Sequence, residues 1–497
     1  MYLGIDCGTQ GTKALLVDDE GKVLGRGYAR HALIERSSGA REQEPQWWVN
    51  AMRTAIKEAM TAEPGTKPVL ALGVSGQQHG LVVLDEQFEV IRAAKLWNDT
   101  ETSLENSEIV RRLGGRAEFF RRFGIVPLPG YTLSKLLWLA EKEPANFARI
   151  RHILLPHEYL NFWLTGQIRA EFGDASGTAF FDVRSRQWAR EVLDAIDDGS
   201  GQLFSALPSL IGSTQIVGML RPEVAAELGL PADCVVSSGG GDNMMGAIGT
   251  GNIHEGFVTL SLGTSSTVYS YSNQPANDPT GNVAAFCSSS GGWLPLVCTM
   301  NATNVVTATV ELLGKTVQDI ESALKATPPG SNGLLFLPFL NGERTPDLPN
   351  ARGSLHGISA TNFTPAHLIR AAVEGVSFGI LSGLDLVLQG KAAKLIQVIG
   401  GGSRSDAWRQ LLSDATGATI QVPSEVESGC LGAAIQAMVA WSADQGQPRT
   451  FSEVVDAMVH FDSATTCSPR AELRQAYNAA RQSYREKLDA IYPTNSD

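Results

Sequence analysis

The amino-acid sequence predicts an α/β protein built from two domains of related architecture. A strand, a glycine-rich turn and a second strand begin the chain ("MYLGIDCGTQGTKALLVD"), and a unit of the same pattern ("GFVTLSLGTSSTVYSYSN") begins at residue 256. A pattern that returns after about half the chain indicates duplication. The length of 497 residues is also enough for more than one hydrophobic core.

The strands of both units are bounded by residues that favour turns. The apolar start of the first unit leads into "DCGTQGT", the run "KALLVD" ends at Asp19-Glu20-Gly21, and "VLGRGYA" follows as a third strand. In the second unit, "FVTLSL" and "TVYSYS" flank the turn "GTSS", and Ser261 stands where the first unit has Asp6. The sequence therefore predicts a meander and a matching hairpin.

Three segments carry helix start signals. Pro45 opens "QWWVNAMRTAIKEAM", and Thr364-Pro365 opens a helix so apolar that we expect burial on most sides. Ser468-Pro469 opens a closing helix whose apolar stripe favours core packing over a partner-binding face. The stripe consists of Leu473, Tyr477, Ala480, Tyr484, Leu488 and Ile491. The motifs place the domain boundary near residue 248, giving domains of 1–248 and 249–497.

Both glycine-rich turns are candidate phosphate sites. Glycine lets the backbone approach a ligand closely, so that N–H groups and hydroxyls at a turn can bind phosphate. A single turn of this kind is more often an ordinary hairpin. The presence of one such turn in each half of the chain favours a shared role in phosphate binding. The candidates are Gly8, Thr9, Gln10, Gly11, Thr12 and Lys13 in the first turn and Gly263, Thr264 and Ser265 in the second.

Asp6 lies directly before the first turn. A carboxylate next to a polyphosphate would be repelled unless a divalent cation lay between them, so Asp6 is a candidate for holding Mg²⁺ and its water shell. A turn-capping role is the structural alternative. Because Ser261 carries no charge, we expect the metal on the side of the first half.

Residues 237–251 ("SSGGGDNMMGAIGTG") bring Asp242 and Asn243 to the start of a predicted helix. A helix cap is the ordinary explanation for an aspartate at this place. The three preceding glycines leave room for a substrate to approach. A catalytic acid–base role for Asp242 therefore competes with the capping role.

The stretch 398–417 reads as a strand, a glycine turn (Gly400, Gly401 and Gly402) and a helix that begins near Ser405. This arrangement resembles a shelf on which a nucleotide can lie against the backbone. It matches neither the Walker pattern nor the dinucleotide pattern G-x-G-x-x-G. The sequence alone indicates a nucleotide site of another type.

Two segments, "GVSGQQHG" (73–80) and "LWNDTET" (96–102), place polar side chains after short apolar strands. They supply donors and acceptors for a polyhydroxylated ligand, although plain surface loops are the alternative. The candidate sugar-binding residues are Gln78, His79, Trp97, Asn98, Asp99, Asp242 and Asn243. A metal-ligand role for His79 is not favoured, because no second histidine lies nearby in the sequence.

The composition excludes several function classes. A net charge of −12 argues against a broad nucleic-acid or anionic-membrane surface. The six cysteines show no C-x-x-C spacing, which is typical of reduced thiols in a cytosolic protein. We expect no apolar run of membrane-spanning length, and Asp6 interrupts any signal-peptide core. The sequence therefore predicts a cytoplasmic protein.

Taken together and in order, these stretches resemble the FGGY family of carbohydrate kinases along essentially the whole chain. The stretches that carry the resemblance are "GIDCGTQGTKALLVD" (4–18), "EQEPQWW" (42–48), "GVSGQQHG" (73–80), "LWND" (96–99), "GGGDN" (239–243), "SLGTSS" (261–266), "FLPFLNGERTP" (336–346) and "VIGGGSRSDAWRQLLSDATG" (398–417). The combination is specific to the family, although no single turn is.

The resemblance implies a duplicated actin-like, ribonuclease-H-like fold, with sugar bound mainly by the N-terminal domain, ATP mainly by the C-terminal domain, and a cleft that closes between them. Asp242 aligns with the family's catalytic base, and Gln78 with His79 aligns with the pair that contacts the ketose. The similarity is greatest to members acting on D-xylulose, many of which carry Met where this chain has Gln78.

The reaction implied is transfer of the ATP γ-phosphate to the terminal hydroxyl of D-xylulose, with Mg²⁺ positioned through Asp6. As the assembly, we expect a homodimer. Another ketose or polyol, such as L-ribulose, L-xylulose or a sugar alcohol, is the alternative within enzymes. A non-catalytic actin-like ATP-binding module, in which Asp242 only caps a helix, is the alternative outside them.

Overall fold

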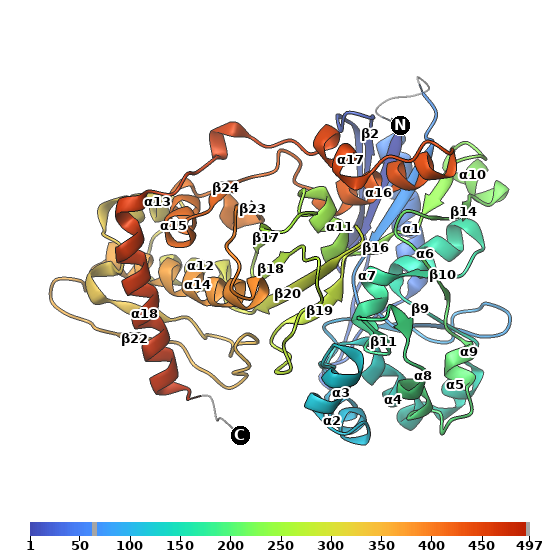
Figure 1. The fold of residues 1–497 in the computed structure, drawn as a ribbon, viewed down its shortest axis with the longest axis horizontal. Helices are drawn as coiled ribbons and strands as arrows, with labels where there is room; N and C mark the ends of the chain where they lie inside the picture. Colours follow the sequence, from blue (N-terminus) through green and yellow to red (C-terminus); the bar gives the residue numbers. More distant parts are fainter. Residues whose placement is uncertain (62–66, 494–497) are drawn as a thin grey trace. The chain divides into compact units, whose positions relative to one another are not determined.

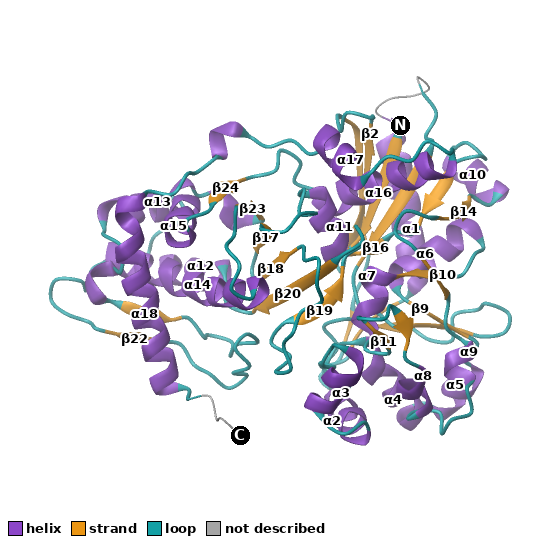
Figure 2. Cartoon of the chain, viewed as in Figure 1, coloured by secondary structure: helices purple, strands orange, loops and turns teal. Residues whose placement is uncertain are grey.

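The computed structural model describes residues 1–61 and 67–493 as two compact units of helices and strands (Figures 1 and 2). The first unit consists of Met1–Ile253, Ser272–Pro295 and Glu427–His460. The second consists of His254–Tyr271, Leu296–Val426 and Phe461–Asp497. Each unit has its own hydrophobic core.

The first unit is built on a mixed sheet with the strand order β14-β15-β6-β1-β2-β3. Strands β1, β2 and β3 are successively antiparallel, whereas β6 runs parallel to β1 and β15 parallel to β6. The strands are β1 (Tyr2–Cys7), β2 (Gly11–Val17), β3 (Val23–Arg30), β6 (Ala71–Gly76), β14 (Ile216–Met219) and β15 (Val235–Ser237). The short strand β16 (Gly240–Gly241) also pairs with β6. The predicted meander is confirmed.

Four helices of the first unit matter for the site. They are α1 (Pro45–Thr61), α6 (Pro156–Thr165), α11 (Asp242–Gly249) and α16 (Ser428–Asp444). The predicted apolar face of α1 is confirmed, because Trp48, Met52 and Ile56 are buried against the core of the sheet. Helix α16 is buried along most of its length, which makes it a core helix of this unit.

The remaining elements of the first unit surround this sheet. The strands are β4 (Ile34–Glu35), β5 (Arg41–Gln43), β7 (Val82–Leu84), β8 (Ala94–Lys95), β9 (His152–Leu154), β10 (Arg169–Glu171), β11 (Phe181–Asp182), β12 (Gln187–Trp188), β13 (Ser209–Ile211) and β19 (Ala284–Cys287). The helices are α2 (Ser103–Arg112), α3 (Arg116–Phe123), α4 (Thr132–Lys142), α5 (Pro144–Arg149), α7 (Phe172–Ala175), α8 (Arg190–Asp194), α9 (Gln202–Ser205), α10 (Pro222–Leu228), α17 (Phe451–Met458) and the 3-10 helix η1 (Ser176–Thr178).

The second large sheet has six strands in the order β19-β20-β18-β17-β23-β24, and the last five of them follow the same plan. Strands β17, β18 and β20 are successively antiparallel, whereas β23 runs parallel to β17 and β24 parallel to β23. These strands are β17 (Phe257–Leu262), β18 (Ser266–Ser270), β20 (Trp293–Thr299), β23 (Leu395–Ile399) and β24 (Thr419–Gln421). The directions repeat those of β3-β2-β1-β6-β15, so the predicted duplication is present in the topology.

Helices and short elements complete the second unit. They are α12 (Thr303–Leu312), α13 (Asp319–Ala326), α14 (Pro365–Leu388), α15 (Asp406–Thr416), α18 (Arg474–Ile491), β21 (Leu335–Leu337), β22 (Ser354–His356), η2 (Ser331–Gly333), η3 (Gly401–Arg404), η4 (Ser463–Thr465) and η5 (Ala471–Leu473). Helix α14 is buried on most sides, as predicted.

Two expectations need correction. By length and composition α14 could cross a membrane, contrary to the expectation that no segment could, but 78% of its most apolar window is buried inside the fold. The closing helix α18 begins at Arg474 rather than after Pro469. Residues Ala471–Leu473 before it form the 3-10 helix η5, and the backbone N–H of Arg470 donates to the Asp414 carboxylate (2.9 Å). Tyr477 and Tyr484 are buried, so the core-packing interpretation is confirmed for the centre of the stripe.

Candidate active site

The carboxyl ends of neighbouring strands bring the predicted acidic residues to one edge of the first sheet. Asp6 on β1 stands beside Ser75 on β6, and Ser75 stands beside Gly240 on β16. Asp242 follows two residues later as the first residue of α11. Open α/β sheets bind their ligands at the carboxyl ends of the strands, so this edge is the candidate site.

Asp242 sits at the start of α11, with Gly241 at the N-cap position. Its Oδ1 accepts hydrogen bonds from the backbone N–H (2.8 Å) and the side-chain Nδ2 (3.0 Å) of Asn243. Burial raises the pKa of Asp242 to about 7, and the negative charges of Asp6 and Asp174 add to this rise. A carboxyl group that titrates near neutral pH can exchange a proton with a substrate hydroxyl.

Gln78 joins this pair from the segment after β6. The side-chain Nδ2 of Asn243 donates to Gln78 Oε1 (2.9 Å), so the Gln78 Nε2 group points elsewhere. That Nε2 atom is buried and has no hydrogen-bond partner among the described residues, and the same holds for Asn98 Oδ1. A buried donor or acceptor without a partner costs about 1–3 kcal/mol. A ligand with hydroxyl groups would supply the missing partners.

His79 is held in place by neighbours on α4 and beside it. Its backbone is left-handed (φ 65°), and its carbonyl oxygen accepts from Lys135 Nζ (2.5 Å) and Thr132 Oγ1 (3.2 Å). Its ring stacks on Tyr131 with 4.5 Å between ring centroids. Burial lowers the pKa of Lys135 to about 7. The stacking on Tyr131 and the hydrogen bonds to the His79 carbonyl therefore fix the orientation of the His79 ring.

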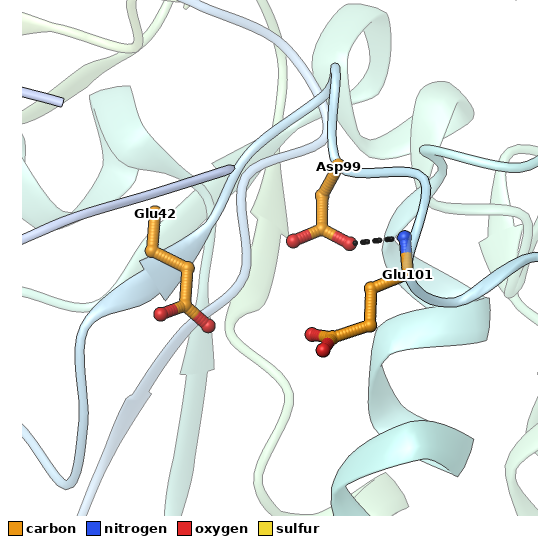
Figure 3. A group of neighbouring side chains, drawn as sticks. All are labelled: Glu42, Asp99 and Glu101. Atoms are coloured by element: carbon orange, nitrogen blue, oxygen red, sulfur yellow. Dashed lines mark hydrogen bonds between the residues drawn. The ribbon is translucent and has the colours of Figure 1, made fainter. Parts of the chain in front are cut away.

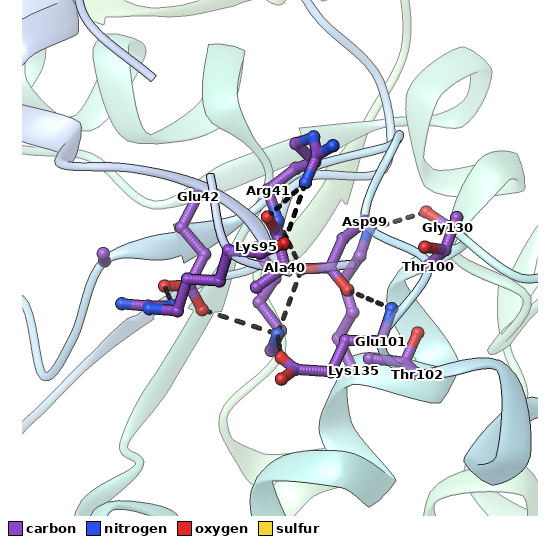
Figure 4. Close-up of polar contacts among 12 residues, drawn as sticks. Ala40, Arg41, Glu42, Lys95, Asp99, Thr100, Glu101, Thr102, Gly130 and Lys135 are labelled. Atoms are coloured by element: carbon purple, nitrogen blue, oxygen red, sulfur yellow. Dashed lines mark hydrogen bonds and ion pairs between the residues drawn. The ribbon is translucent and has the colours of Figure 1, made fainter. Parts of the chain in front are cut away.

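Three carboxylates, from Glu42, Asp99 and Glu101, gather beside the segment 96–102 (Figure 3). Their oxygens lie within 4.8 Å of one another, which is close enough to hold a metal ion. Lys95 Nζ, however, lies 2.5 Å from Glu101 Oε2, 3.0 Å from Asp99 Oδ2 and 3.4 Å from Glu42 Oε1 (Figure 4). The ammonium group supplies the positive charge, so the cluster is a buried ion pair network.

Asp99 is engaged by the protein through both of its oxygens. Oδ2 accepts from Lys95 and from the backbone N–H of Arg41 (2.9 Å), and Oδ1 accepts from the backbone N–H of Glu101 (3.0 Å). These contacts shape the loop that carries Trp97 and Asn98. Direct contact between Asp99 and a sugar stays a prediction.

The first glycine-rich turn is tied to the same loop. Thr9 Oγ1 donates to Gln77 Oε1 (3.2 Å) and accepts from Trp97 Nε1 (2.9 Å), while Gln43 Nε2 donates to the Thr9 carbonyl (2.8 Å). The tip at Gln10 is exposed. The turn is therefore anchored on one side and open on the other.

The other residues of this turn differ in how far they are exposed to solvent. Gly8 is partly exposed, Gly11 is buried, and the Thr12 side chain is fully buried, which leaves its hydroxyl inside the protein. Lys13 Nζ lies 2.6 Å from Glu427 Oε2, just before α16 begins. A role in phosphate binding stays a prediction for all of them, and Lys13 would have to share its charge with Glu427.

Asp6 has the surroundings of a metal-side carboxylate. Its Oδ1 accepts from Ser75 Oγ (2.6 Å), and the side chain is partly exposed. Burial raises the pKa of Asp6, whereas the Ser75 hydrogen bond and the charge of Lys13 act in the opposite direction. A Cβ atom built on Gly429 of α16 would lie 3.0 Å from the carboxyl carbon of Asp6. An accessible carboxylate is the type of ligand that Mg²⁺ prefers, so the residues present fit this ion.

The turn between β17 and β18 forms the corresponding site of the second unit. The Gly263 carbonyl accepts from both the backbone N–H (3.0 Å) and Oγ1 (2.7 Å) of Thr303, the first residue of α12. Thr264 and Ser265 at the tip are exposed. The turn therefore presents hydroxyl and N–H groups from a firmly held base.

The triple-glycine turn packs against the end of β17. A Cβ atom on Gly400 (φ 87°) would lie 2.7 Å from the Leu262 carbonyl oxygen, and one on Gly402 would lie 2.8 Å from Leu262 Cβ. Nothing lies within 4 Å of a Cβ atom built on Gly401. Glycine is therefore required at two positions for close packing, and the third leaves an open backbone surface next to Gly263.

Ser405 has a structural task in this region. It is the N-cap of α15, where its Oγ accepts from the Trp408 backbone N–H (3.2 Å). The same hydroxyl donates to Glu321 Oε1 (2.5 Å). These contacts occupy the hydroxyl, so a direct contact of Ser405 with ATP stays a prediction.

Gln436, a fully buried residue of α16 that holds the turn before Asp242, was missed in the sequence analysis. Its Oε1 accepts from Ser237 Oγ (2.9 Å) and the Gly239 N–H (2.8 Å), and its Nε2 donates to the Gly239 carbonyl (2.9 Å). Ser75, His157, Asp174 and Glu427 were missed in the same way. Ser75 lies within the candidate segment 73–80 but was not selected there, and no local signal distinguishes the other three.

Comparisons with known proteins agree with the motifs. The model of the FGGY family of carbohydrate kinases, N-terminal domain, matches residues 1–249, and that of the C-terminal domain matches residues 258–441. The chain is 44% identical to a xylulose kinase of Haemophilus influenzae, over 99% of this chain and 100% of the relative.

Two solved structures show the same fold over the whole chain. A protein described as a xyloylose kinase from Brucella ovis is 32% identical, with a TM-score of 0.90 over 99% of both chains. A gluconate kinase from Lactobacillus acidophilus is 25% identical, with a TM-score of 0.89 over 99% of this chain and 98% of the other. The family matches, the full-length relative and the duplicated sheets lead to one conclusion: the chain belongs to the FGGY family of carbohydrate kinases.

Proposed function

We propose that this protein transfers the γ-phosphate of ATP to the terminal hydroxyl of D-xylulose, giving ADP and D-xylulose 5-phosphate. The observation that carries the proposal is the chain of contacts from Asp242 through Asn243 to Gln78, which ends in an unpartnered buried donor. It sets a proton acceptor beside a group that needs a hydroxylated ligand. The names of the full-length relatives support D-xylulose as that ligand.

In this mechanism, Asp242 accepts the proton of the terminal hydroxyl of the sugar as the hydroxyl oxygen attacks the γ-phosphorus. Asn243 orients the carboxylate through its two hydrogen bonds to Oδ1. Because phosphoryl transfer is loose, proton loss can come late, and a base with a pKa of about 7 is sufficient. Gln78 and His79 position the ketose so that its terminal hydroxyl meets this carboxylate.

In the first unit, N–H and hydroxyl donors at Thr9 and Gln10 would bind phosphate oxygens and offset their charge. In the second unit, Thr264 and Ser265 offer donors of the same kind. Asp6 would hold Mg²⁺, which supplies positive charge at the transferred phosphoryl group when bound. Ser75 fixes the Asp6 carboxylate for this task.

We assign the sugar to residues 1–248 and ATP mainly to residues 249–497. The ATP assignment rests on the turn 263–265 and the glycine shelf 400–402. Helix α16 lies in the C-terminal half of the sequence but packs in the first unit, so its contribution is to Asp6 and Asp242 rather than to the nucleotide. A homodimer and a cytoplasmic location stay predictions.

A panel of sugars assayed for ADP release tests the substrate. We expect D-xylulose to give the highest kcat/KM, above L-xylulose, L-ribulose, gluconate and sugar alcohols. Gluconate is included because of the structural relative from Lactobacillus acidophilus, and the others because Gln78 stands where many members have Met. Preference for another sugar would replace D-xylulose, and no sugar-dependent ADP release would contradict kinase activity.

A further inference from the structure

A buried ion pair lies directly behind the turn that carries Asp242. His157, the second residue of α6, has its Nδ1 atom 2.8 Å from Asp174 Oδ2, and both side chains are 0% exposed. The pair belongs to the first unit and touches none of the predicted phosphate residues in the described contacts. No step of the proposed mechanism has used it.

The pair lies close to the ends of the active-site strands because three residues there are glycines, which have no side chains. Asp174 Oδ1, which has no hydrogen-bond partner among the described residues, would lie 3.0 Å from a Cβ atom on Gly241. His157 would lie 2.9 Å (Cβ) from one on Gly76 and 3.1 Å (Cδ2) from one on Gly239. Gly76 precedes Gln77 and Gln78, and Gly241 precedes Asp242, so the pair supports both strand ends.

Asp174 cannot turn away from this position. The carboxylate of Glu171 accepts from the backbone N–H groups of Asp174 (2.5 Å) and Gly173 (2.8 Å), which fixes the short helix α7. Ser289 Oγ donates to the same carboxylate (2.9 Å). The free oxygen of Asp174 therefore faces Gly241 because its backbone and its other oxygen are both held.

The surroundings of His157 favour its charged form. Burial lowers the pKa of His157, but the hydrogen bond and charge of Asp174 outweigh it, so that the pKa is raised overall. Burial raises the pKa of the adjacent Glu158 to about 8, which leaves that carboxyl group neutral near pH 7. The unpartnered Oδ1 atom of Asp174 lies toward the backbone that carries Asp242, and the charge of Asp174 contributes to the raised pKa of Asp242.

Stability alone does not explain such a pair. Removing two charges from water costs several kcal/mol per ion, and apolar side chains of similar volume often replace buried ion pairs without loss of stability. The three glycines that lie beside the pair (Gly76, Gly239 and Gly241) also lose more conformational entropy on folding than residues with side chains. Both costs are associated with the same feature, which is that the ion pair lies very close to the ends of the active-site strands.

We propose that Asp174, held by His157, is a positioning residue for Asp242. Its fixed negative charge repels the Asp242 carboxylate and keeps it turned outward, toward the acceptor hydroxyl, rather than inward along Gly241. This inference rests on the proposed kinase function, since it assigns a role to residues behind the same site. Neither His157 nor Asp174 contacts the substrate in this scheme.

The test compares variants in steady-state kinetics with the sugar that the wild type phosphorylates fastest. Asp174→Asn keeps the shape but removes the charge, and we expect kcat to fall about 10- to 100-fold, as for a misplaced reacting group, while both KM values stay within about twofold. His157→Gln should act similarly, whereas His157→Lys, which keeps a cation beside Asp174, should retain most of the wild-type kcat. Asp197→Asn, at another buried aspartate of the first unit, should change nothing.

The outcomes separate the two proposals. A folded Asp174→Asn variant with wild-type kcat, or one that loses activity only through KM, would overturn the positioning role. If both neutralising variants unfold, or if His157→Lys fails to rescue kcat, the pair is structural and the inference is wrong. The wild-type sugar panel decides the proposed function independently, because a different preferred sugar leaves the comparison of kcat values in place.

Discussion

The two sheets share strand order and direction but differ in the chemistry of their carboxyl ends. In the first unit, Asp6 at the end of β1 stands between Lys13 and Ser75. In the second, Ser261 at the matching place of β17 stands between Thr267 and Ile399. One plan therefore presents an acidic edge in one unit and a neutral edge in the other.

The difference extends to what lies behind the strands. The first unit buries ionisable groups, such as His157, Asp174 and Lys135, next to its strand ends. The second unit places glycines and hydroxyls there, at 263–265 and 400–402. A neutral turn rich in N–H groups suits an anionic nucleotide, whereas an acidic edge suits a metal and a hydroxyl that must lose a proton. Duplication supplied the framework, and side chains at a few positions separated the tasks.

The largest expected effect comes from removing the base of the acidic edge. Asp242→Asn should lower kcat about 10²- to 10⁴-fold, the usual contribution of general acid–base catalysis, because the amide cannot accept the proton. ATP binding, measured by calorimetry, should be nearly unchanged. A folded variant that keeps more than a few per cent of wild-type turnover would contradict the assignment.

The pH profile should show the same group. Asp242 is active as the carboxylate, so activity is present above its pKa of about 7 and is lost as the pH falls through that value. Below the pKa, kcat/KM should drop about tenfold per pH unit. The measurement is kcat/KM for the ketose from pH 5 to 9, and the acid limb should be absent from the residual activity of Asp242→Asn. A flat profile between pH 6 and 8 would argue against the raised pKa.

Shortening a side chain of the sugar segment should have a moderate effect. His79→Ala should raise the ketose KM about tenfold, the equivalent of one lost hydrogen bond of about 1.4 kcal/mol, with little change in the ATP KM. His152→Ala, at a partly buried histidine that stacks on Phe88, is the matched control. Equal increases in both KM values would place His79 outside the sugar pocket.

The smallest effect should come from giving the second unit an acid of its own. Ser261→Asp would place a carboxylate near the proposed phosphate turn, and screening by solvent should limit the rise in ATP KM to about three- to tenfold. The isosteric neutral variant Ser261→Asn should leave the ATP KM near the wild-type value. An unchanged ATP KM in Ser261→Asp would mean that the two strand ends are less alike in function than in topology.

Much of the fold could be predicted, because strands, turns and helix starts are local. The turns at 7–12 and 263–265, the start of α1 at Pro45 and the strand–glycine–helix order at 395–416 all follow from periodicity and from glycine or proline at fixed places. The start of α18 could not, since residues Ala471–Leu473 form a 3-10 helix, which local sequence patterns do not separate from the first turn of an α-helix.

The candidate site divides in the same way. Asp6, Gln78 and Asp242 were found because each lies at or just after the end of an apolar strand and within two residues of a glycine. Gln436 and the pair of His157 and Asp174 were not found, because their contacts join segments far apart in the chain. Asp99 was found as a ligand candidate, but the structure adds that its oxygens are bound by Lys95 and two backbone groups.

The sequence by itself determined the duplicated α/β plan, the family and the residues at the strand ends, since these depend on spacing along the chain. Only the tertiary structure decided which of those residues are accessible, which are bound by neighbours, and how their charges interact. The physical reason is that burial and electrostatic interaction are properties of three-dimensional proximity. The pKa of Asp242 is set by burial and by Asp6 and Asp174, whose positions relative to it arise only when the chain folds.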